Sequence, residues 1–225
     1  MIDDGVRAVF FDAVGTLITP REPVARTYAE FARRHGQDVA EERVRGTFRE
    51  AFDRQEEIDR AAGWRTNEAR ERARWLAIVS EVLSRTHAYF DELWGWFATP
   101  AAWKIHPEAA EVILELTRRG LAVGIASNFD SRLLGLIDAF PELVPVRPRC
   151  AISSLIGWRK PAPEFFAYLI QLAGYPAAEI LHVGDDPRND VDGATAAGLR
   201  AILFDPHATT SGPAQISQLR DLLGR

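Results

Sequence analysis

Hydrophobic and polar positions follow two different patterns along the chain, and the changes between them divide it into regions. An apolar run over residues 6–11 ends in Asp12, which is typical of a strand buried in a parallel sheet. From residue 22 to residue 98, apolar residues recur at helical spacing among Arg, Glu and Ala, with no strand-like run. From about residue 100, strand-like and helix-like segments alternate again. The pattern therefore predicts an α/β domain with an all-helical segment inserted after its first strand.

The alternating region predicts a series of separate elements. We expect strands over residues 121–126, 179–183 and 201–204, and helices over residues 106–119, 131–140, 163–173, 190–197 and 215–223. Gly120, Gly174 and Gly198 follow three of these helices, where glycine is the favoured C-terminal residue. Strands that alternate with helices indicate a doubly wound, Rossmann-like parallel sheet. We therefore expect an α/β core made of residues 1–19 and 101–225, and a helical cap domain made of residues 20–100.

Composition and charge narrow the class of protein. The chain has 225 residues, 47% of them hydrophobic, and a formal charge of −5, which disfavours non-specific binding to nucleic acid or to an anionic membrane. Cys150 is the single cysteine, which excludes an intrachain disulfide and fits a reducing compartment. The first residues lack the pattern of a signal peptide, and no apolar stretch is long enough to span a bilayer. We expect a cytoplasmic monomer or homodimer, with the charge runs at residues 33–34 and 70–74 on solvated helix faces.

Four short stretches carry most of the residues suited to chemistry, and each follows a predicted strand or precedes a predicted helix. In chain order they are Asp12 with the Gly15-Thr16 turn, Ser127-Asn128, Lys160-Pro161, and Gly184-Asp185-Asp186 followed by Asn189-Asp190. Open α/β sheets place ligands and chemistry beyond the carboxyl ends of their strands. We therefore expect these side chains at one edge of the sheet. His182 lies inside a predicted core strand, where a buried imidazole with a hydrogen-bond partner is expected rather than a ligand.

The residue types point to phosphoryl transfer. Clustered aspartates repel one another and need a cation, and Asp12 and Asp185 supply the oxygen ligands that suit Mg²⁺. With the repulsion offset, Asp12 can attack a phosphate and form an aspartyl-phosphate. Ser127 and Lys160 would bind the phosphate oxygens and stabilise charge in the transition state. Asp190 would orient Lys160 or a metal-bound water from behind.

Three further positions have secondary roles in this prediction. The Gly15-Thr16 turn offers backbone N–H groups to an anion, since glycine lets the backbone come close. Asn128 either contacts the substrate or holds its own turn. Asp186 supports the site from behind the metal ligands, as Asp190 does.

These four stretches, in this order and on these elements, resemble the motifs of the haloacid-dehalogenase-like hydrolase superfamily. The helical insertion after the first motif resembles the cap of its capped subfamily I, and residues 12–17 and 127–133 are similar to the branch named after a rhythmically expressed insect gene product. The resemblance implies that Asp12 is the nucleophile. It implies that Mg²⁺ binds to Asp12, to the backbone carbonyl of Val14 and to Asp185, and that Ser127 and Lys160 contact phosphate.

Val14 departs from the pattern of the family phosphatases. These enzymes usually carry a second aspartate at this position, which protonates the leaving group and later activates water. Valine can do neither, and a positioned acid or base typically contributes about 10²–10⁴-fold. Three explanations stay open: a leaving group that needs no proton, such as an acyl or aryl phosphate; a proton donor elsewhere, for example in the cap; or slow or absent turnover.

The sequence thus predicts a Mg²⁺-dependent hydrolase, a phosphatase that acts on a small phosphorylated metabolite. One alternative is a weak or inactive member that binds a phosphate or metabolite. Another is a metal-independent haloacid dehalogenase, because dehalogenases of the family also lack the second aspartate. They usually lose the Gly-Asp pair of the fourth motif, however, and Gly184-Asp185 is intact. A Schiff-base mechanism in the cap is disfavoured because Lys104 and Lys160 are the only lysines.

Overall fold

A six-stranded parallel sheet forms the centre of the computed structural model, which describes residues 2, 4–83, 90–208 and 214–224. Its strand order is β5-β4-β1-β6-β7-β8, so the first strand of the chain lies in the middle. The strands are β1 (Ala8–Phe11), β4 (Ala122–Ser127), β5 (Cys150–Ile152), β6 (Ile180–Gly184), β7 (Arg200–Phe204) and β8 (Gln215–Ile216). All four residues of β1 are buried, as expected for a strand covered on both faces. The predicted doubly wound α/β fold is confirmed.

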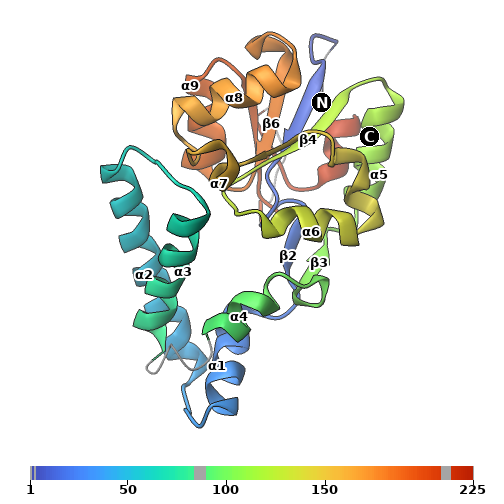
Figure 1. The fold of residues 1–225 in the computed structure, drawn as a ribbon. Helices are drawn as coiled ribbons and strands as arrows, with labels where there is room; N and C mark the ends of the chain where they lie inside the picture. The colour runs from blue at the N-terminus through green and yellow to red at the C-terminus, as the bar shows by residue number, and fades with distance from the viewer. Residues whose placement is uncertain (1, 3, 84–89, 209–213, 225) are drawn as a thin grey trace.

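Alternate residues of β1 face opposite sides of the sheet and belong to two different cores. Val9 and Phe11 join a cluster with apolar residues of α5 (Ala109–Arg118) and α6 (Arg132–Ala139). Ala8 and Phe10 join a second cluster with residues of α8 (Pro163–Ala173) and α9 (Gly193–Ala196). This is the two-residue period of a strand, with one helical layer against each face (Figure 1). The remaining short helices of this region are η3 (Pro141–Val146), α7 (Ser153–Ile156), η4 (Ala177–Glu179), η5 (Pro187–Asp192) and η6 (Leu219–Leu223).

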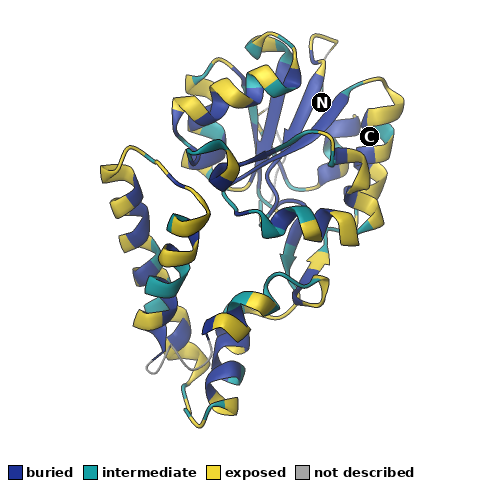
Figure 2. Ribbon diagram, in the orientation of Figure 1, coloured by how far each residue is buried: buried dark blue, intermediate teal, exposed yellow. Residues whose placement is uncertain are grey.

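Four helices between the first strand and the rest of the sheet form a separate group, which we call the cap. They are α1 (Val24–Arg34), α2 (Glu41–Ala61), α3 (Glu68–Val82) and α4 (Phe90–Trp96), and they bury an apolar cluster of their own. The chain enters and leaves the cap through two antiparallel strands, β2 (Ile18–Pro20) and β3 (Trp103–Ile105), the latter preceded by η2 (Pro100–Ala102). Figure 2 shows that the buried faces of the cap helices turn toward one another.

The loop between α2 and α3 and the start of α3 are anchored to the α/β domain. The carboxylate of Glu68 accepts hydrogen bonds from the Ser131 backbone N–H at 2.9 Å, the Ser131 hydroxyl at 2.8 Å and the Ser154 hydroxyl at 2.5 Å. The Thr66 N–H donates to the Gly157 carbonyl, and the Arg159 N–H donates to the Trp64 carbonyl. These contacts fix the near ends of the two long cap helices above the carboxyl ends of the strands.

The structure differs from the sequence prediction at several short elements. Strands β5 and β8 were not predicted, since segments of three and two residues are too short to show a period of two. The helix predicted over residues 190–197 is divided into the π-helical η5 and the four-residue α9. The helix predicted over residues 215–223 is wrong at its start, where Gln215–Ile216 form β8, and its last five residues are the 3-10 helix η6. Of the helices in the described ranges, none combines the length and the apolar character that crossing a bilayer requires.

We expect Gly124→Ala to destabilise the protein by about 1–3 kcal/mol, the usual cost of overpacking a core. Gly124 lies in β4, where an added Cβ would meet the Phe10 ring at 2.4 Å and the Arg149 carbonyl oxygen at 2.5 Å. Gly46→Ala is the matched control, because Gly46 lies in α2 with nothing within 4 Å of an added Cβ. That control should stabilise the helix by about 0.5–1 kcal/mol. Urea unfolding of both variants checks this, and equal midpoints would contradict it.

Candidate active site

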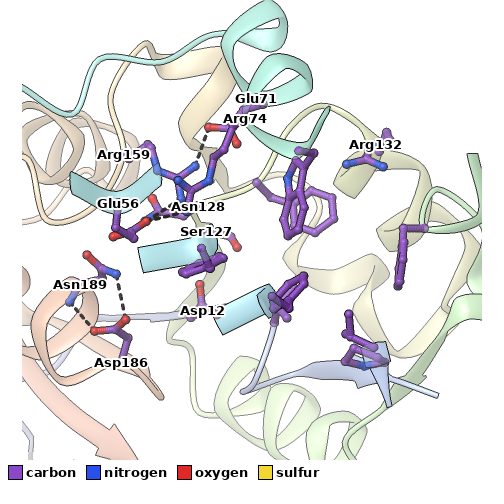
Figure 3. A pocket seen from close by; sticks show the side chains of 18 of the residues that line it. Asp12, Glu56, Glu71, Arg74, Ser127, Asn128, Arg132, Arg159, Asp186 and Asn189 are labelled. Carbon is purple, nitrogen blue, oxygen red and sulfur yellow. Dashed lines mark hydrogen bonds and ion pairs between the residues drawn. The ribbon is translucent and has the colours of Figure 1, made fainter. Parts of the chain in front are cut away.

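Three adjacent strands bring the predicted site residues together. Asp12 follows β1, Ser127 ends β4 and Asp185 follows β6, and β1 lies between the other two strands. These residues line one cavity of about 370 Å³, which also includes Val14, Asn128, Lys160, Asp186, Asn189 and Asp190. Figure 3 shows Asp12 and Ser127 side by side in this cavity. The expectation that the four stretches meet at the carboxyl edge of the sheet is therefore met by the geometry.

Lys160 is the centre of the hydrogen-bond network in the site. Its ammonium donates to Asp12 Oδ1 at 2.7 Å, to Asp190 Oδ1 at 2.5 Å and to the Ala126 carbonyl at 2.7 Å. An ammonium has three donors, so all of them are used within the protein. Burial would lower the pKa of Lys160, but Asp12 and Asp190 outweigh burial and raise it to about 12. Lys160 is therefore cationic and fixes the orientation of Asp12.

Asp190 is fully engaged by donors of the protein. Besides Lys160, His182 Nε2 lies 2.9 Å from Asp190 Oδ1, and the Asp186 N–H donates to Asp190 Oδ2 at 3.0 Å. Burial favours the protonated form, but Lys160 and His182 outweigh burial and hold the pKa of Asp190 below its usual range. Asp190 is thus an ionised carboxylate whose contacts are internal.

His182 is a site residue whose contact the sequence reasoning missed. Its ring is fully buried, with Nδ1 3.1 Å from the Phe10 carbonyl oxygen and Nε2 facing Asp190. The expected hydrogen-bond partner exists, but that partner belongs to the active site. The position of His182 in the sequence could have indicated this contact, since His182 lies two residues before Gly184 and in register with Phe10. In a strand of alternating faces, it therefore shares a side with the loop that holds Asp190.

The acidic residues of the site fit a divalent cation. Carboxylate oxygens of Asp12, Asp185 and Asp190 all lie within 4.8 Å of one another. Because both oxygens of Asp190 are already bonded, the donors left for a metal are on Asp12 and Asp185. Among the described residues, Asp12 Oδ2 has no hydrogen-bond partner, whereas Asp12 Oδ1 is held by Lys160. Hard carboxylate oxygens of this number suit Mg²⁺, which also keeps several waters.

The turn after β1 leaves room for this acidic pair. Gly15 has φ +100°, and an added Cβ would lie 2.2 Å from Asp185 Oδ2. Only glycine combines that backbone conformation with so close an approach. The predicted role of Gly15 is therefore partly steric, since it lets the Asp185 carboxylate sit against the turn.

Burial and repulsion between carboxylates shift Asp12 and Asp185 toward their protonated forms. Desolvation raises the pKa of Asp185 to about 7, with further contributions from Asp12 and Asp190. Desolvation also raises the pKa of Asp12, although Lys160 opposes the shift. A bound cation would reverse this effect at both residues, because it favours the ionised form.

Asn128, Asp186 and Thr16 have structural contacts or positions within the protein. Asn128 holds the Lys160 peptide, accepting from its N–H at 2.7 Å and donating to its carbonyl at 2.9 Å. This is the turn-holding alternative, and a substrate contact of Asn128 stays a prediction. Asp186 caps η5 by accepting from the N–H groups of Arg188 and Asn189. Thr16 is fully buried, and its hydroxyl has no hydrogen-bond partner in the described part of the chain.

Ser127 and Val14 complete the floor of the cavity. Ser127 is buried, lines the cavity and makes no side-chain hydrogen bond with the described residues, so its hydroxyl is available to a ligand. Val14 lines the same cavity and packs against the core beneath it. The acidic side chains grouped with Asp12 among the described residues are Asp185 and Asp190.

A buried ion cluster on the cap forms another wall of the cavity. Arg74 of α3 donates to Asp59 at 2.6 Å and to Glu56 at 2.8 Å, both on α2. Arg159, next to Lys160 in sequence, reaches up from the α/β domain to Glu71 at 2.6 Å. Figure 3 shows Arg74, Arg159, Glu56 and Glu71 gathered on one side of the cavity.

The prediction of a solvated face over residues 70–74 is wrong for Glu71 and Arg74, which are each 1% exposed. The reason is that the α2 carboxylates of Glu56 and Asp59 meet Arg74 across the helix interface, and the guanidinium of Arg159 meets Glu71. A charge run on one helix does not reveal such partners on another. The sequence reasoning therefore missed this cluster.

Comparison with known proteins places this site in a family. A family model described as "haloacid dehalogenase-like hydrolase" matches residues 6–198. The human haloacid dehalogenase-like hydrolase domain-containing protein 3 is 28% identical over 212 residues, which are 88% of this chain and 81% of that protein. The phosphoserine phosphatase of Thermus thermophilus is 31% identical over 182 residues, which are 78% of this chain and 61% of that protein.

A solved structure shows the same fold as a whole. A structure described as a dehalogenase aligns with a TM-score of 0.75 and 19% identity, over 99% of this chain and 98% of that one. At this identity the likeness concerns the fold alone and carries no activity with it.

We expect Asp185→Asn to stabilise the metal-free protein at pH 8. A carboxyl group whose pKa rises on folding costs stability as pH rises from its unfolded value of about 4 to about 7. Removing the charge should therefore restore roughly 1 kcal/mol at pH 8 after discounting for solvent screening, or about 2–4 °C in Tm. At pH 4 the difference should vanish. Thermal unfolding in EDTA at both pH values measures it, with exposed Asp53→Asn as control, and a loss of stability at pH 8 would contradict the repulsion.

Proposed function

The chain belongs to the haloacid dehalogenase-like hydrolase family, and we propose that it is a phosphatase that hydrolyses a small phosphate ester through an aspartyl-phosphate on Asp12. The observation that carries the proposal is the geometry of Asp12. One of its oxygens is fixed by the Lys160 ammonium, while the other has no partner among the described residues and belongs to a carboxylate that lines the cavity. That is the arrangement of an oriented nucleophile next to a cation. The relative named as a phosphoserine phosphatase supports the same reaction class.

Asp12, Asp185 and the backbone carbonyl of Val14 would hold Mg²⁺, which neutralises the charge between two carboxylates and an incoming phosphate. The retained Asp185 also favours this function over metal-independent dehalogenation, for which a second carboxylate beside the nucleophile would only add repulsion. The donor set is compatible with the ion, since Asp190 is bonded internally and leaves the other two carboxylates available.

The residues of this chain divide the reaction between them. Asp12 Oδ2 attacks phosphorus, the bond from phosphorus to the leaving oxygen breaks, and the leaving group departs with the electron pair. Ser127 contacts the phosphate oxygens. The predicted contact of the Gly15 N–H with phosphate is not available, because that group donates to the Ile18 carbonyl at 2.9 Å. Water then attacks the same phosphorus, the bond from phosphorus to Asp12 Oδ2 breaks, the proton of the water leaves with inorganic phosphate, and Asp12 returns to its carboxylate form. Lys160 and Asp190 act by orientation, since their contacts hold Asp12 in place.

Asp12→Asn should abolish turnover of acetyl phosphate, by on the order of 10³-fold or more, because the amide is not a nucleophile. EDTA should have a similar effect on the unmodified protein, and added Mg²⁺ should restore the rate. Release of inorganic phosphate is the measurement, with Asp53→Asn on the exposed face of α2 as the matched control. Phosphate binding without turnover would support the binding protein instead, and EDTA-insensitive halide release from a 2-haloacid would support the dehalogenase.

Val14→Asp should raise turnover of alkyl phosphates by about 10-fold or more, within the 10²–10⁴-fold that a positioned acid can supply. Val14 is half-buried and lines the cavity beside Asp12, so a carboxyl group there would face the leaving oxygen. Val14→Asn is the control for size without acidity and should not raise the rate. Steady-state rates on glycerol 3-phosphate test this, and equal rates for the folded Asp and Asn variants would count against the missing acid.

A further inference from the structure

The cap side of the cavity is lined mainly by aromatic rings. Six of the aromatic residues that line it are Tyr28, Phe48, Phe52, Trp75, Trp94 and Phe97. Phe48 contacts three of the others, with ring centroids 5.7 Å from Tyr28, 6.2 Å from Phe52 and 6.3 Å from Trp75. Phe48, Phe52 and Trp75 are only partly buried, so ring surface remains facing the cavity. Such a wall stabilises an apolar, flat group by burial and ring stacking.

The cations of the cavity are already neutralised by the protein. The four that line it among the described residues are Arg74, Arg132, Arg159 and Lys160. Arg132 makes two hydrogen bonds of 2.7 Å to Asp130 and one of 2.8 Å to the Trp94 carbonyl, and its guanidinium lies over the Trp94 ring, 3.3 Å from the ring centroid. Arg74 and Arg159 are paired with Glu56 and Glu71 as described above. A second phosphate, or a carboxylate on the substrate, would therefore have to displace an existing ion pair in a buried site.

The polar group that is still available on the cap is neutral. The Tyr28 hydroxyl makes no hydrogen bond with the described residues, although Tyr28 is 2% exposed and lines the cavity. Burial raises the pKa of Tyr28 above its usual range, and Arg132 only partly opposes this, so the group stays a hydroxyl. The Tyr28 hydroxyl therefore suits an uncharged substituent that forms a hydrogen bond, and it does not neutralise a charged one.

Resting on the proposed function, we infer that the substrate is an aryl phosphate whose aromatic group carries no further charge. The rings of Phe48, Phe52 and Trp75 hold the aromatic group, and Asp12 receives the phosphoryl group. Two independent features agree on this class: the neutral aromatic cavity, and Val14 at the position of the missing acid. A phenolate leaves with its electron pair and needs no proton donor, whereas an alkoxide does. The cavity of about 370 Å³ is near the lower end of ligand pockets, which fits one or two rings.

A substrate series tests the inference on the complete, unmodified protein with Mg²⁺. We expect kcat/KM for 4-methylphenyl and 2-naphthyl phosphate to exceed that for cyclohexyl phosphate and O-phosphoserine by at least 10-fold. The sharpest pair is 4-methylphenyl against 4-carboxyphenyl phosphate. The carboxylated phenol is the better leaving group, so leaving-group chemistry alone would make it faster. A slower 4-carboxyphenyl substrate, mainly through a higher KM, would show that the cavity rejects charge.

Acetyl phosphate separates failure of this inference from failure of the phosphatase proposal. It has a good leaving group and no ring, so its turnover depends on Asp12 and Mg²⁺ alone. If acetyl phosphate is hydrolysed while O-phosphoserine or 4-carboxyphenyl phosphate surpasses the neutral aryl esters, the aryl inference is overturned and the phosphatase stands. If acetyl phosphate and the aryl esters are all inert, the proposed function fails and the inference falls with it.

A variant of the aromatic wall provides a second measurement. Phe48→Leu keeps apolar volume but removes a ring, and it should raise KM for 2-naphthyl phosphate about 2- to 10-fold, the usual worth of an aromatic pair. KM for acetyl phosphate, which has no ring, should rise less than KM for 2-naphthyl phosphate, and thermal unfolding checks that the variant is folded. Ile58→Leu is the matched control, since Ile58 lies on the same helix α2 and is 51% exposed. An equal change for both substrates, or none for either, would place the aromatic group elsewhere.

Discussion

The contact of the Lys160 ammonium with Asp12 and Asp190 is the constraint on which the rest of the site depends. Two carboxylates and an ammonium are almost wholly removed from water here, and such groups are tolerated only when they are paired and hydrogen-bonded. The ammonium also bonds the Ala126 carbonyl near the end of β4. One side chain thereby connects the loop after β1, the strand β4 and the segment η5. Asp12 is oriented because its partner has no freedom left.

The same network separates the roles of three similar carboxylates. Asp190 is occupied by Lys160, His182 and a backbone N–H, Asp12 is occupied on one oxygen, and Asp185 stands at the open side of the group. Two glycines make this density of charge sterically possible. An added Cβ at Gly15 would run into Asp185, and one at Gly184 would lie 2.2 Å from the Asp190 carboxyl carbon. The glycines of the first and fourth motifs thus serve the packing of the carboxylates as well as the turns of the backbone.

Buried charges are also paired at the cap side of the cavity, but there the pairing leaves a mainly apolar surface. Its buried arginines and carboxylates neutralise one another along one wall, which leaves aromatic rings as the main surface offered to a substrate. The α/β domain therefore supplies charge and the cap supplies apolar surface. Val14 lines the cavity with Asp12, where the two domains meet. Valine cannot donate a proton, so the leaving group has to depart without a proton from this residue.

Local sequence was sufficient for the elements with long, uniform patterns and for the ends of the strands. The buried runs of β1, β4 and β6 and the residues that follow them predicted the fold and the meeting of Asp12, Ser127 and Asp185, because parallel strands end at one edge. Local sequence did not predict β5 and β8, which owe their conformation to pairing with β4 and β7 and are too short to show a period. Nor did it predict that His182 holds Asp190, that all three donors of Lys160 are used, or that Arg74 is buried among carboxylates. Those facts depend on which side chains from distant segments face each other, and only packing of the whole chain decides where a charge finds its partner.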